Sequence, residues 1–219
     1  MSEEQEKTST DIKLPGLFAF KEGMATFYNE SGEAVPVTVL RYEPWVISQI
    51  KTDARDGYSA VQLACQPKKK KNSNAAEKGH LKASGFENGA QYVRELRVKA
   101  PEGTQVGARV SIESLSKGDI IKISGVSKGH GFTGVLKRHN FQGGPGAHGS
   151  KFHRRPGSVG NRTWPGRVMP GKKFPGHYGD ESITVKSVQV VKVMPEENVV
   201  MVKGPVPGAR NSLVKMVRE

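Results

Sequence analysis

The sequence predicts a mainly β protein in which many short strands close, or nearly close, into a barrel. Short runs rich in Val, Ile, Tyr and Thr recur along the chain, as expected of half-buried strands. Turn sequences separate these runs at close spacing with little helix between them, a pattern typical of barrels. Residues 127–179 interrupt the pattern with a long segment that contains no Asp or Glu. We therefore expect a barrel that carries one long basic insertion.

The N-terminal part supplies the first predicted strands. Residues 1–13 show no periodicity and are interpreted as a flexible tail. The strands that follow are expected at residues 23–28, 34–41, 45–51 and 58–65. Asn29–Glu33 is a plausible hairpin turn between the first two strands, and Asp56-Gly57 turns the chain into the fourth.

A loop and helix are expected to interrupt the barrel sequence over residues 66–90. Pro67 ends the strand pattern, and four lysines follow at 68–71, for which a solvated loop and an RNA contact are equally good interpretations. Residues 75–84 can form a short helix that Gly85 would end. Strand character then returns at residues 91–99, 106–112 and 120–126.

The C-terminal part returns to the barrel pattern. Strands are expected at residues 182–194, 199–203 and 213–217, with a tight connection at 195–198. We assign residues 14–126 and 180–219 to the globular barrel domain, and 127–179 to an extended loop between two of its strands. A long irregular segment within a compact domain is uncommon and is usually functional.

The charge balance points to a polyanionic partner. The formal net charge is +13, and residues 127–179 hold ten Lys or Arg and no acid, so +10 of that charge lies in this segment. Nucleic acid fits better than a membrane surface, because no long apolar run or basic amphipathic helix is present. The polar N-terminus lacks the features of a signal peptide, and Cys65 stands alone, which favours a cytoplasmic location.

The composition of residues 127–179 favours RNA over a solvated tail. Aromatic residues are spaced among the cations, so that phosphate contacts and stacking on unpaired bases could alternate along the chain. Thirteen glycines permit positive φ values and close backbone contacts. We interpret six of them as positions where the backbone approaches a partner: Gly143, Gly144, Gly146, Gly157, Gly160 and Gly166.

Two nucleotide-binding motifs are only partly present. Gly129–Gly134 spells GxGxxG, but no carboxylate follows until Asp180 to hold a ribose. Gly166–Lys173 resembles a phosphate-binding loop, but Lys173 occupies the position where Ser or Thr must bind magnesium. We reject both.

Neither a metal site nor catalysis is expected. Five of the six histidines lie in 127–179, but their spacing places no pair on one helical face, and no acid or thiol is near to complete a site. General acid–base chemistry needs a carboxylate or His in an apolar cleft, and this segment lacks carboxylates. We expect no enzyme activity, no cofactor, no metal and no small-molecule substrate.

Four segments together resemble a known family. They are GLFAFKEGMATFYNESGEAVPVTVL, GVSKGHGFTGVLKRHNF, HRRPGSVGNRTWPGRVMPGKKFPGHYG and VVKVMPEENVVMVKGPVPGA. The chain resembles, from about Leu17 to its C-terminus, the bacterial form of the third protein of the large ribosomal subunit. Residues 1–13 lie outside the resemblance.

The resemblance implies a fold, a role and partners. It implies a translation-factor-like β-barrel, early binding to large-subunit rRNA, contacts with neighbouring large-subunit proteins, and a loop that reaches toward the peptidyl transferase centre. The loop tip would be Gly157–Gly166, comprising Gly157, Ser158, Val159, Gly160, Asn161, Arg162, Thr163 and Trp164. Some bacterial members carry a methylated Gln in this tip, and Thr163 stands at its position here.

We expect the insertion to provide the rRNA-binding residues. Those that we expect to neutralise phosphates are Lys128, Lys137, Arg138, Lys151, Arg154, Arg155, Arg162, Arg167, Lys172 and Lys173. Candidates for base or ribose contacts are His130, His153, His177 and Trp164, with burial against its own loop as the alternative for Trp164. Asn161 is a further rRNA-binding candidate. Two other classes of protein fit less well: a free-standing nucleic-acid chaperone would spread its charge over the surface, and a nucleic-acid enzyme would need acids for metal binding or proton transfer, for which only scattered barrel carboxylates are available.

Overall fold

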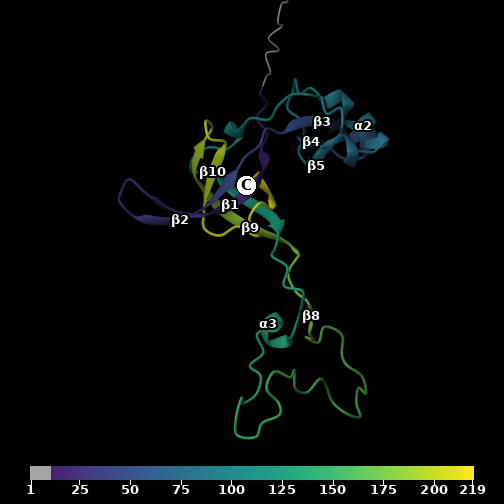
Figure 1. The fold of residues 1–219 in the computed structure, drawn as a ribbon, viewed down its shortest axis with the longest axis vertical. Coiled ribbons are helices and arrows are strands. Elements are labelled where there is room, and N and C mark those ends of the chain that lie inside the picture. The colour runs from purple at the N-terminus through teal and green to yellow at the C-terminus, as the bar shows by residue number, and fades with distance from the viewer. Residues whose placement is uncertain (1–10) are drawn as a thin grey trace, which may run out of the picture. The chain divides into compact units, whose positions relative to one another are not determined.

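The computed structural model describes residues 11–219, which form two compact units. Unit 1 comprises the chain up to Gly125 together with Ile183–Glu219, and unit 2 comprises Val126–Ser182. The barrel and an accompanying small sheet make up most of unit 1 (Figure 1). Strands dominate the described residues, so the predicted mainly β fold with a closed barrel is confirmed.

Six antiparallel strands close the barrel in the order β1-β11-β6-β9-β10-β2. The strands are β1 (Gly16–Tyr28), β2 (Ala34–Arg41), β6 (Ile120–Val126), β9 (Ser182–Met194), β10 (Val199–Lys203) and β11 (Leu213–Arg218). The first strand pairs with the last, so that Gly16 lies opposite Val217. Closure therefore joins the two ends of the sequence and leaves the barrel without free edges.

The first two strands form the predicted hairpin. Tyr28 pairs with Ala34 across the turn at 29–33, where the Gly32 N–H donates to the Asn29 carbonyl at 2.9 Å. The register shifts between Lys21 and Gly23, and beyond this irregularity the hairpin extends past the barrel wall (Figure 1). Its distal part is exposed, because side chains there have no opposing sheet to pack on.

Alternating apolar residues of the barrel strands form the core. Leu17, Leu40 and Ile123 are fully buried, as expected where every second side chain faces inward. Trp45 is also fully buried, and its ring centroid lies 5.1 Å from that of Phe18. Burial of each such side chain contributes roughly 1.5–3 kcal/mol to the stability of unit 1.

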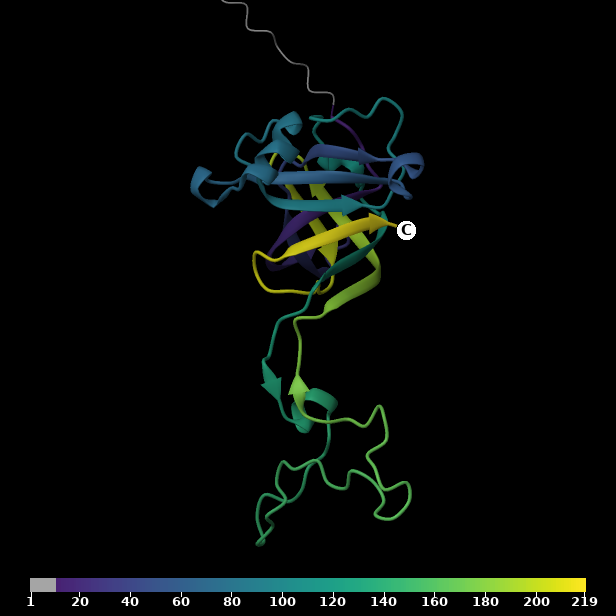
Figure 2. The same cartoon turned by 90° about the vertical axis from the view of Figure 1, so that its right-hand side faces the viewer.

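A separate three-stranded sheet shares this core. Its strands are β3 (Val46–Lys51), β4 (Ala60–Pro67) and β5 (Ala90–Leu96), in the order β3-β4-β5, and it lies across the barrel (Figure 2). Ile47, Leu63 and Leu96 of this sheet are fully buried in the same cluster as the barrel residues. The alternation in the sequence indicated these strands without showing that they pair outside the barrel.

Short helices connect the strands of this sheet. They are α1 (Asp53–Asp56), η1 (Lys70–Asn72), α2 (Ala75–Leu81) and η2 (Lys82–Ser84). Gly57 and Gly85 end α1 and η2 in the left-handed conformation, with φ values of 76° and 88°. The predicted helix over 75–84 and its end at Gly85 are thereby confirmed, with its last turn in 3-10 form.

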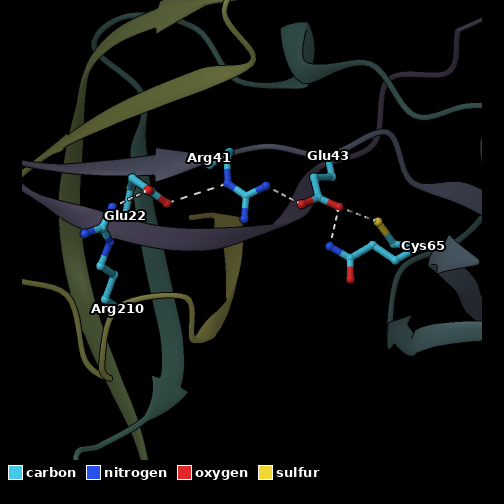
Figure 3. A network of polar contacts seen from close by, with 6 residues as sticks. Glu22, Arg41, Glu43, Cys65 and Arg210 are labelled. Carbon is cyan, nitrogen blue, oxygen red and sulfur yellow. Dashed lines mark hydrogen bonds and ion pairs between the residues drawn. The ribbon is translucent and has the colours of Figure 1, made fainter. Parts of the chain in front are cut away.

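A chain of ion pairs crosses from the barrel to the small sheet (Figure 3). Glu22 contacts Arg210 at 2.9 Å and Arg41 at 3.6 Å, and Arg41 contacts Glu43 at 2.5 Å. Glu43 also lies 3.7 Å from the Cys65 sulfur. The hydrogen bond from Arg210 is the main cause that lowers the pKa of Glu22, whereas burial raises the pKa of the Cys65 thiol to about 12, so this thiol is unreactive.

The predicted strand at 106–112 is wrong. Arg109 and Val110 each form only an isolated bridge, to Val46 and Ile12 respectively, and η3 (Ile112–Ser114) begins at the end of the expected strand. Gly107 has a φ of 93°, which breaks the extended conformation. Val110 and Ile112 are nevertheless buried, whereas Val106 is exposed, and the segment is held by separate backbone hydrogen bonds to Trp45, Ile47 and Ile12 rather than by a regular ladder.

Part of the predicted N-terminal tail is attached to the domain. The Ile12 N–H donates to the Arg109 carbonyl at 2.8 Å, and Lys13 lies 3.2 Å from Glu113. Residues 1–10 of that prediction lie outside the described residues.

Candidate nucleic-acid interface

Unit 2 contains more local structure than the sequence indicated. Its two arms pair as a short ribbon formed by β7 (Phe132–Thr133) and β8 (Gly176–His177). The His130 N–H donates to the Tyr178 carbonyl at 2.8 Å, and the Tyr178 N–H donates to the Gly131 carbonyl at 3.0 Å. Gly179 makes this contact possible, because its φ is 76° and an added Cβ would collide with the Lys128 carbonyl.

A short helix connects the ribbon to the rest of the insertion. It is α3 (Val135–His139), which Asn140 ends in the left-handed conformation. Arg138 donates from its guanidinium to the Phe174 carbonyl at 2.8 Å, and the His139 ring nitrogen lies 3.1 Å from the same oxygen. The two arms are thus also held together by side chains.

A closed loop follows at residues 143–153. The Gly144 N–H donates to the His153 carbonyl at 2.8 Å, and an added Cβ at Gly144 would lie 2.5 Å from the Phe152 ring. At Gly143 an added Cβ would lie 2.7 Å from the His153 carbonyl oxygen, and φ is 75°. These two glycines are needed for contacts within the insertion itself, a role that the sequence interpretation did not include.

Large apolar side chains of unit 2 remain exposed. Trp164 is 85% exposed and Phe132 is 79% exposed, whereas Val135 is buried. Neither hydrophobic cluster of the described chain includes a residue from 126–182. The insertion therefore has hydrogen-bonded local structure but lacks the apolar burial that offsets the entropy of ordering a chain.

The cations of unit 2 have no acidic partner within the described residues. The segment 127–179 contains no Asp or Glu, and no ion pair of residues 11–219 involves its lysines or arginines. Unit 1 differs, since several of its cations contact carboxylates at 2.5–3.6 Å. An array of ten unpaired cations creates a strong positive field suited to a phosphate backbone.

The predicted binding residues are almost all accessible. Those that are exposed are Lys128, His130, Lys137, Lys151, His153, Arg154, Arg155, Asn161, Arg162, Trp164, Arg167, Lys172, Lys173 and His177. Arg138 differs, because it is half-buried and donates to Phe174 within the insertion. His130 also makes an internal contact, with its ring centroid 5.0 Å from that of Tyr178.

The predicted tip, Gly157–Gly166, is an irregular loop of exposed residues, with Pro165 half-buried. Gly157 and Gly166 have φ values of 80° and 68°, so these two positions favour glycine whatever surrounds them. The exposure of Trp164 removes the alternative that it packs against its own loop. A planar ring and the Arg162 guanidinium are therefore both presented on one short segment.

Phe132 is one of the aromatic residues spaced among the cations, but the sequence interpretation assigned it no contact of its own. It lies on β7 opposite His177, and most of its ring is exposed. The alternation of aromatic residues with cations was visible in the sequence, but only Trp164 was selected from it. Exposure could not be read from the pattern, because β-branched and aromatic residues in a short strand normally indicate burial.

Across residues 11–219, no three His, Cys, Asp or Glu side chains converge as a metal ion would require. In the same part of the chain, no helix is long and apolar enough to cross a membrane.

Comparisons with known proteins agree with the resemblance. The family described as Ribosomal protein L3 matches residues 59–197, which include the whole basic segment. The Bdellovibrio bacteriovorus protein named "Large ribosomal subunit protein uL3" is 72% identical over 220 residues, covering 100% of both chains. Proteins of the same name from Desulfotalea psychrophila and a Synechococcus strain are 49% and 43% identical and cover 93% and 92% of this chain. On this evidence the chain belongs to the ribosomal protein L3 family, whose members are structural proteins of the ribosome and not enzymes.

Proposed function

We propose that this chain binds large-subunit rRNA through residues 127–179 and thereby serves as a structural constituent of the large ribosomal subunit, in the cytoplasm. Membership of the L3 family supports the ribosomal role. The observation that carries the RNA-binding role is the unpaired charge of unit 2: ten Lys or Arg, no acid in the segment, and no ion pair to them from the described residues.

The absence of an apolar core in the insertion supports the same proposal. A chain that buries little of its own surface becomes ordered when a partner supplies the contacts. Large RNA supplies both phosphates for the cations and unpaired bases for the exposed rings of Trp164 and Phe132. Early binding in assembly follows if the insertion needs RNA around it to become fully ordered, and neighbouring ribosomal proteins would then pack on the barrel.

The tip has a supporting role in this proposal. Gly157–Gly166 offers Arg162 and Trp164 for pairing and stacking, but it contains no acid or thiol that could take part in proton transfer. The tip would therefore hold nucleotides that in turn hold the peptidyl transferase centre. Catalysis would remain with the RNA.

The salt dependence of binding tests the proposed interface. Each phosphate contact contributes roughly 0.7–0.9 to the slope of log affinity against log salt concentration. Replacing Lys151, Arg154 and Arg155 by Ala should reduce the slope for a large-subunit rRNA fragment by about two. The matched control replaces three exposed barrel lysines, Lys122, Lys186 and Lys203, and should leave the slope nearly unchanged. Equal slopes for both triple variants and the unchanged protein would refute the interface.

Deletion of Val159–Trp164 tests the role of the tip. Subunits that carry the deletion should assemble, bind transfer RNA differently and respond differently to drugs of the peptidyl transferase centre. Single-turnover peptide-bond formation with puromycin should remain measurable. Complete loss of this reaction in fully assembled subunits would contradict a supporting role, and unchanged rates with unchanged drug response would show that the tip acts elsewhere.

A further inference from the structure

We propose that unit 1 carries a second RNA site, a pocket beside α2 on the β4–β5 strands that binds one unpaired nucleotide. The proposal rests on the proposed function, because it assumes an RNA partner. It concerns a different surface from the basic insertion, and its residues come from the segment between Gln62 and Arg94.

The pocket has the size and lining of a ligand site. Its volume is about 390 Å³, within the range of roughly 300–1,000 Å³ that small-molecule sites occupy. Leu81, Ala90 and Val93 line it, but Leu81 and Ala90 are only 2% and 4% exposed because they belong to a small hydrophobic cluster. The exposed lining residues include His80 and Arg94, whose side chains suit hydrogen bonding to a nucleobase and stacking on it.

The polar groups of the pocket are held in fixed orientations. The Gln62 side-chain oxygen accepts from Ser48 at 2.9 Å and lies 2.8 Å from the His80 ring nitrogen Nε2. Because an amide oxygen can only accept, His80 Nε2 donates to it. Nδ1 is the His80 nitrogen that is left for a contact with a base or ribose.

Unpaired cations are concentrated in the segment that connects β4 to β5, and Arg94 of β5 is a further one that lines the pocket. Between Gln66 and Gly85 the chain has six lysines and a single acid, Glu77. Lys68 contacts both carboxylate oxygens of Glu77 at 2.9 Å and is neutralised by it. The remaining cations here have no carboxylate within 4 Å in the part of the chain that the structure describes: Lys69, Lys70, Lys71, Lys78, Lys82 and Arg94.

The lysine run is fixed rather than a free solvated loop. The Lys68 N–H donates to the Gly89 carbonyl at 2.9 Å, and the Asn72 N–H donates to the Lys69 carbonyl at 2.9 Å. Asn74 caps α2 by accepting from the Glu77 N–H at 2.9 Å. Because the backbone is already ordered, a ligand would not have to supply the free energy of ordering it.

These features together favour a nucleotide over an acidic peptide. An acidic peptide would use the cations but would leave the planar side chains of the pocket unused. A nucleotide uses both, since its base can stack on Arg94 and contact His80 while its phosphates meet Lys69–Lys71 outside the pocket. Arg94, which lines the pocket, offers a planar guanidinium for stacking.

The test separates the base contact from the phosphate contacts in the full-length protein bound to a large-subunit rRNA fragment. Val93→Phe fills the pocket without changing charge and should weaken binding about tenfold, with an unchanged salt slope. Val93→Thr, of nearly equal size, should bind normally. Replacing Lys69, Lys70 and Lys71 by Gln should reduce the salt slope by about two. Ultraviolet crosslinking of the unchanged protein should join this region to a single-stranded nucleotide.

A second variant tests the pocket independently of Val93→Phe. His80→Ala, at an exposed position, should weaken binding severalfold, and it serves as the pocket variant if Val93→Phe fails to fold. Unchanged affinity for His80→Ala and for a folded Val93→Phe would refute the pocket, and so would the absence of any crosslink between this region and the RNA. The Lys151, Arg154 and Arg155 variant measured in parallel distinguishes the proposals. If its slope falls while the pocket variants bind normally, only the second site is refuted.

Discussion

The two units of this chain differ in how far they bury their apolar side chains and in whether their charges are paired. The barrel and its small sheet bury Leu17, Leu40, Trp45 and Ile123 completely and pair many of their charges internally. The insertion leaves Trp164 and most of its cations exposed and without acidic partners among the described residues. The difference shows that one chain can combine a domain that buries its own apolar core with a segment that buries little apolar surface and leaves its cations without acidic partners in the described chain.

The two units also specify the path of their backbones differently: the insertion uses glycine and the barrel uses the alternation of apolar residues. In the insertion, Gly179 allows one arm to pass close to the Lys128 carbonyl, and Gly144 makes room for Phe152. Such positions specify the path of the backbone without a hydrophobic core. The barrel uses alternation of apolar residues for the same purpose, which is why it supplies most of the stability.

The largest expected contrast is in proteolysis of the isolated protein. Trypsin should cut after Arg154 or Arg162 at least about a thousandfold faster than after Lys122 or Lys215 in the barrel strands, because cleavage there requires opening of the core. Mass spectrometry of a time course gives the sites. Binding of an rRNA fragment should protect the insertion, and resistance of the insertion without RNA would show that it is stable on its own.

Substitution of large apolar residues should give a smaller contrast. Leu40→Ala removes a fully buried side chain and should lower the free energy of unfolding by about 2–5 kcal/mol. Phe132→Ala removes an exposed ring and should change it by less than about 0.5 kcal/mol. Urea denaturation measures both. Equal losses would mean that the insertion is part of the same cooperative unit as the barrel.

The smallest contrast concerns pH. The hydrogen bond from Lys51, at 2.7 Å, is the main cause that lowers the pKa of Glu95. Because the folded pKa lies below the unfolded one, this pair stabilises the protein fully above about pH 4.3 and loses its effect as the pH falls through the folded pKa. Glu95→Gln should therefore cost about 0.2–1 kcal/mol at neutral pH and nothing in strong acid.

Thermal unfolding across this pH range measures the effect. Arg154→Gln is the control from the insertion, and its effect on stability should not vary with pH in this range because Arg154 has no carboxylate partner in the described chain. If Glu95→Gln still lowered stability at low pH, the changed shape of the side chain rather than its lost charge would be the cause.

Local periodicity predicted most strands and the hairpin between neighbouring strands, but not the pairing of strands that are distant in sequence. The hairpin over 23–41, the helix that Gly85 ends and the strand at 182–194 were all visible, since each depends on neighbouring residues. The division into a barrel and a separate sheet was not, because partner choice depends on contacts distant in sequence. The strand expected at 106–112 failed for a related reason: Val110 and Ile112 are buried against segments distant in sequence without forming a regular ladder.

The candidate interface was predictable in composition and not in geometry. Ten Lys or Arg without any Asp or Glu identified residues 127–179 as the candidate RNA-binding segment. The exposure of these cations agrees with that interpretation. The bond from Arg138 to Phe174 and the crowding at Gly143 and Gly144 depend on how the arms fold back. Likewise, four consecutive lysines could not reveal that a pocket lies beside them, because its walls come from β4, α2 and β5.

The pairing of β1 with β11 sets an order of events during synthesis. Gly16 and Val217 are partners, so the barrel cannot close until nearly the whole chain has been made, and bringing such distant segments together is slow. The arms of the insertion, in contrast, pair between His130 and Tyr178, well before β10 and β11 exist. A growing chain therefore presents its basic segment while the barrel is still open. The proposed function therefore predicts that nascent protein shortened after residue 181 already binds RNA, before the barrel has closed.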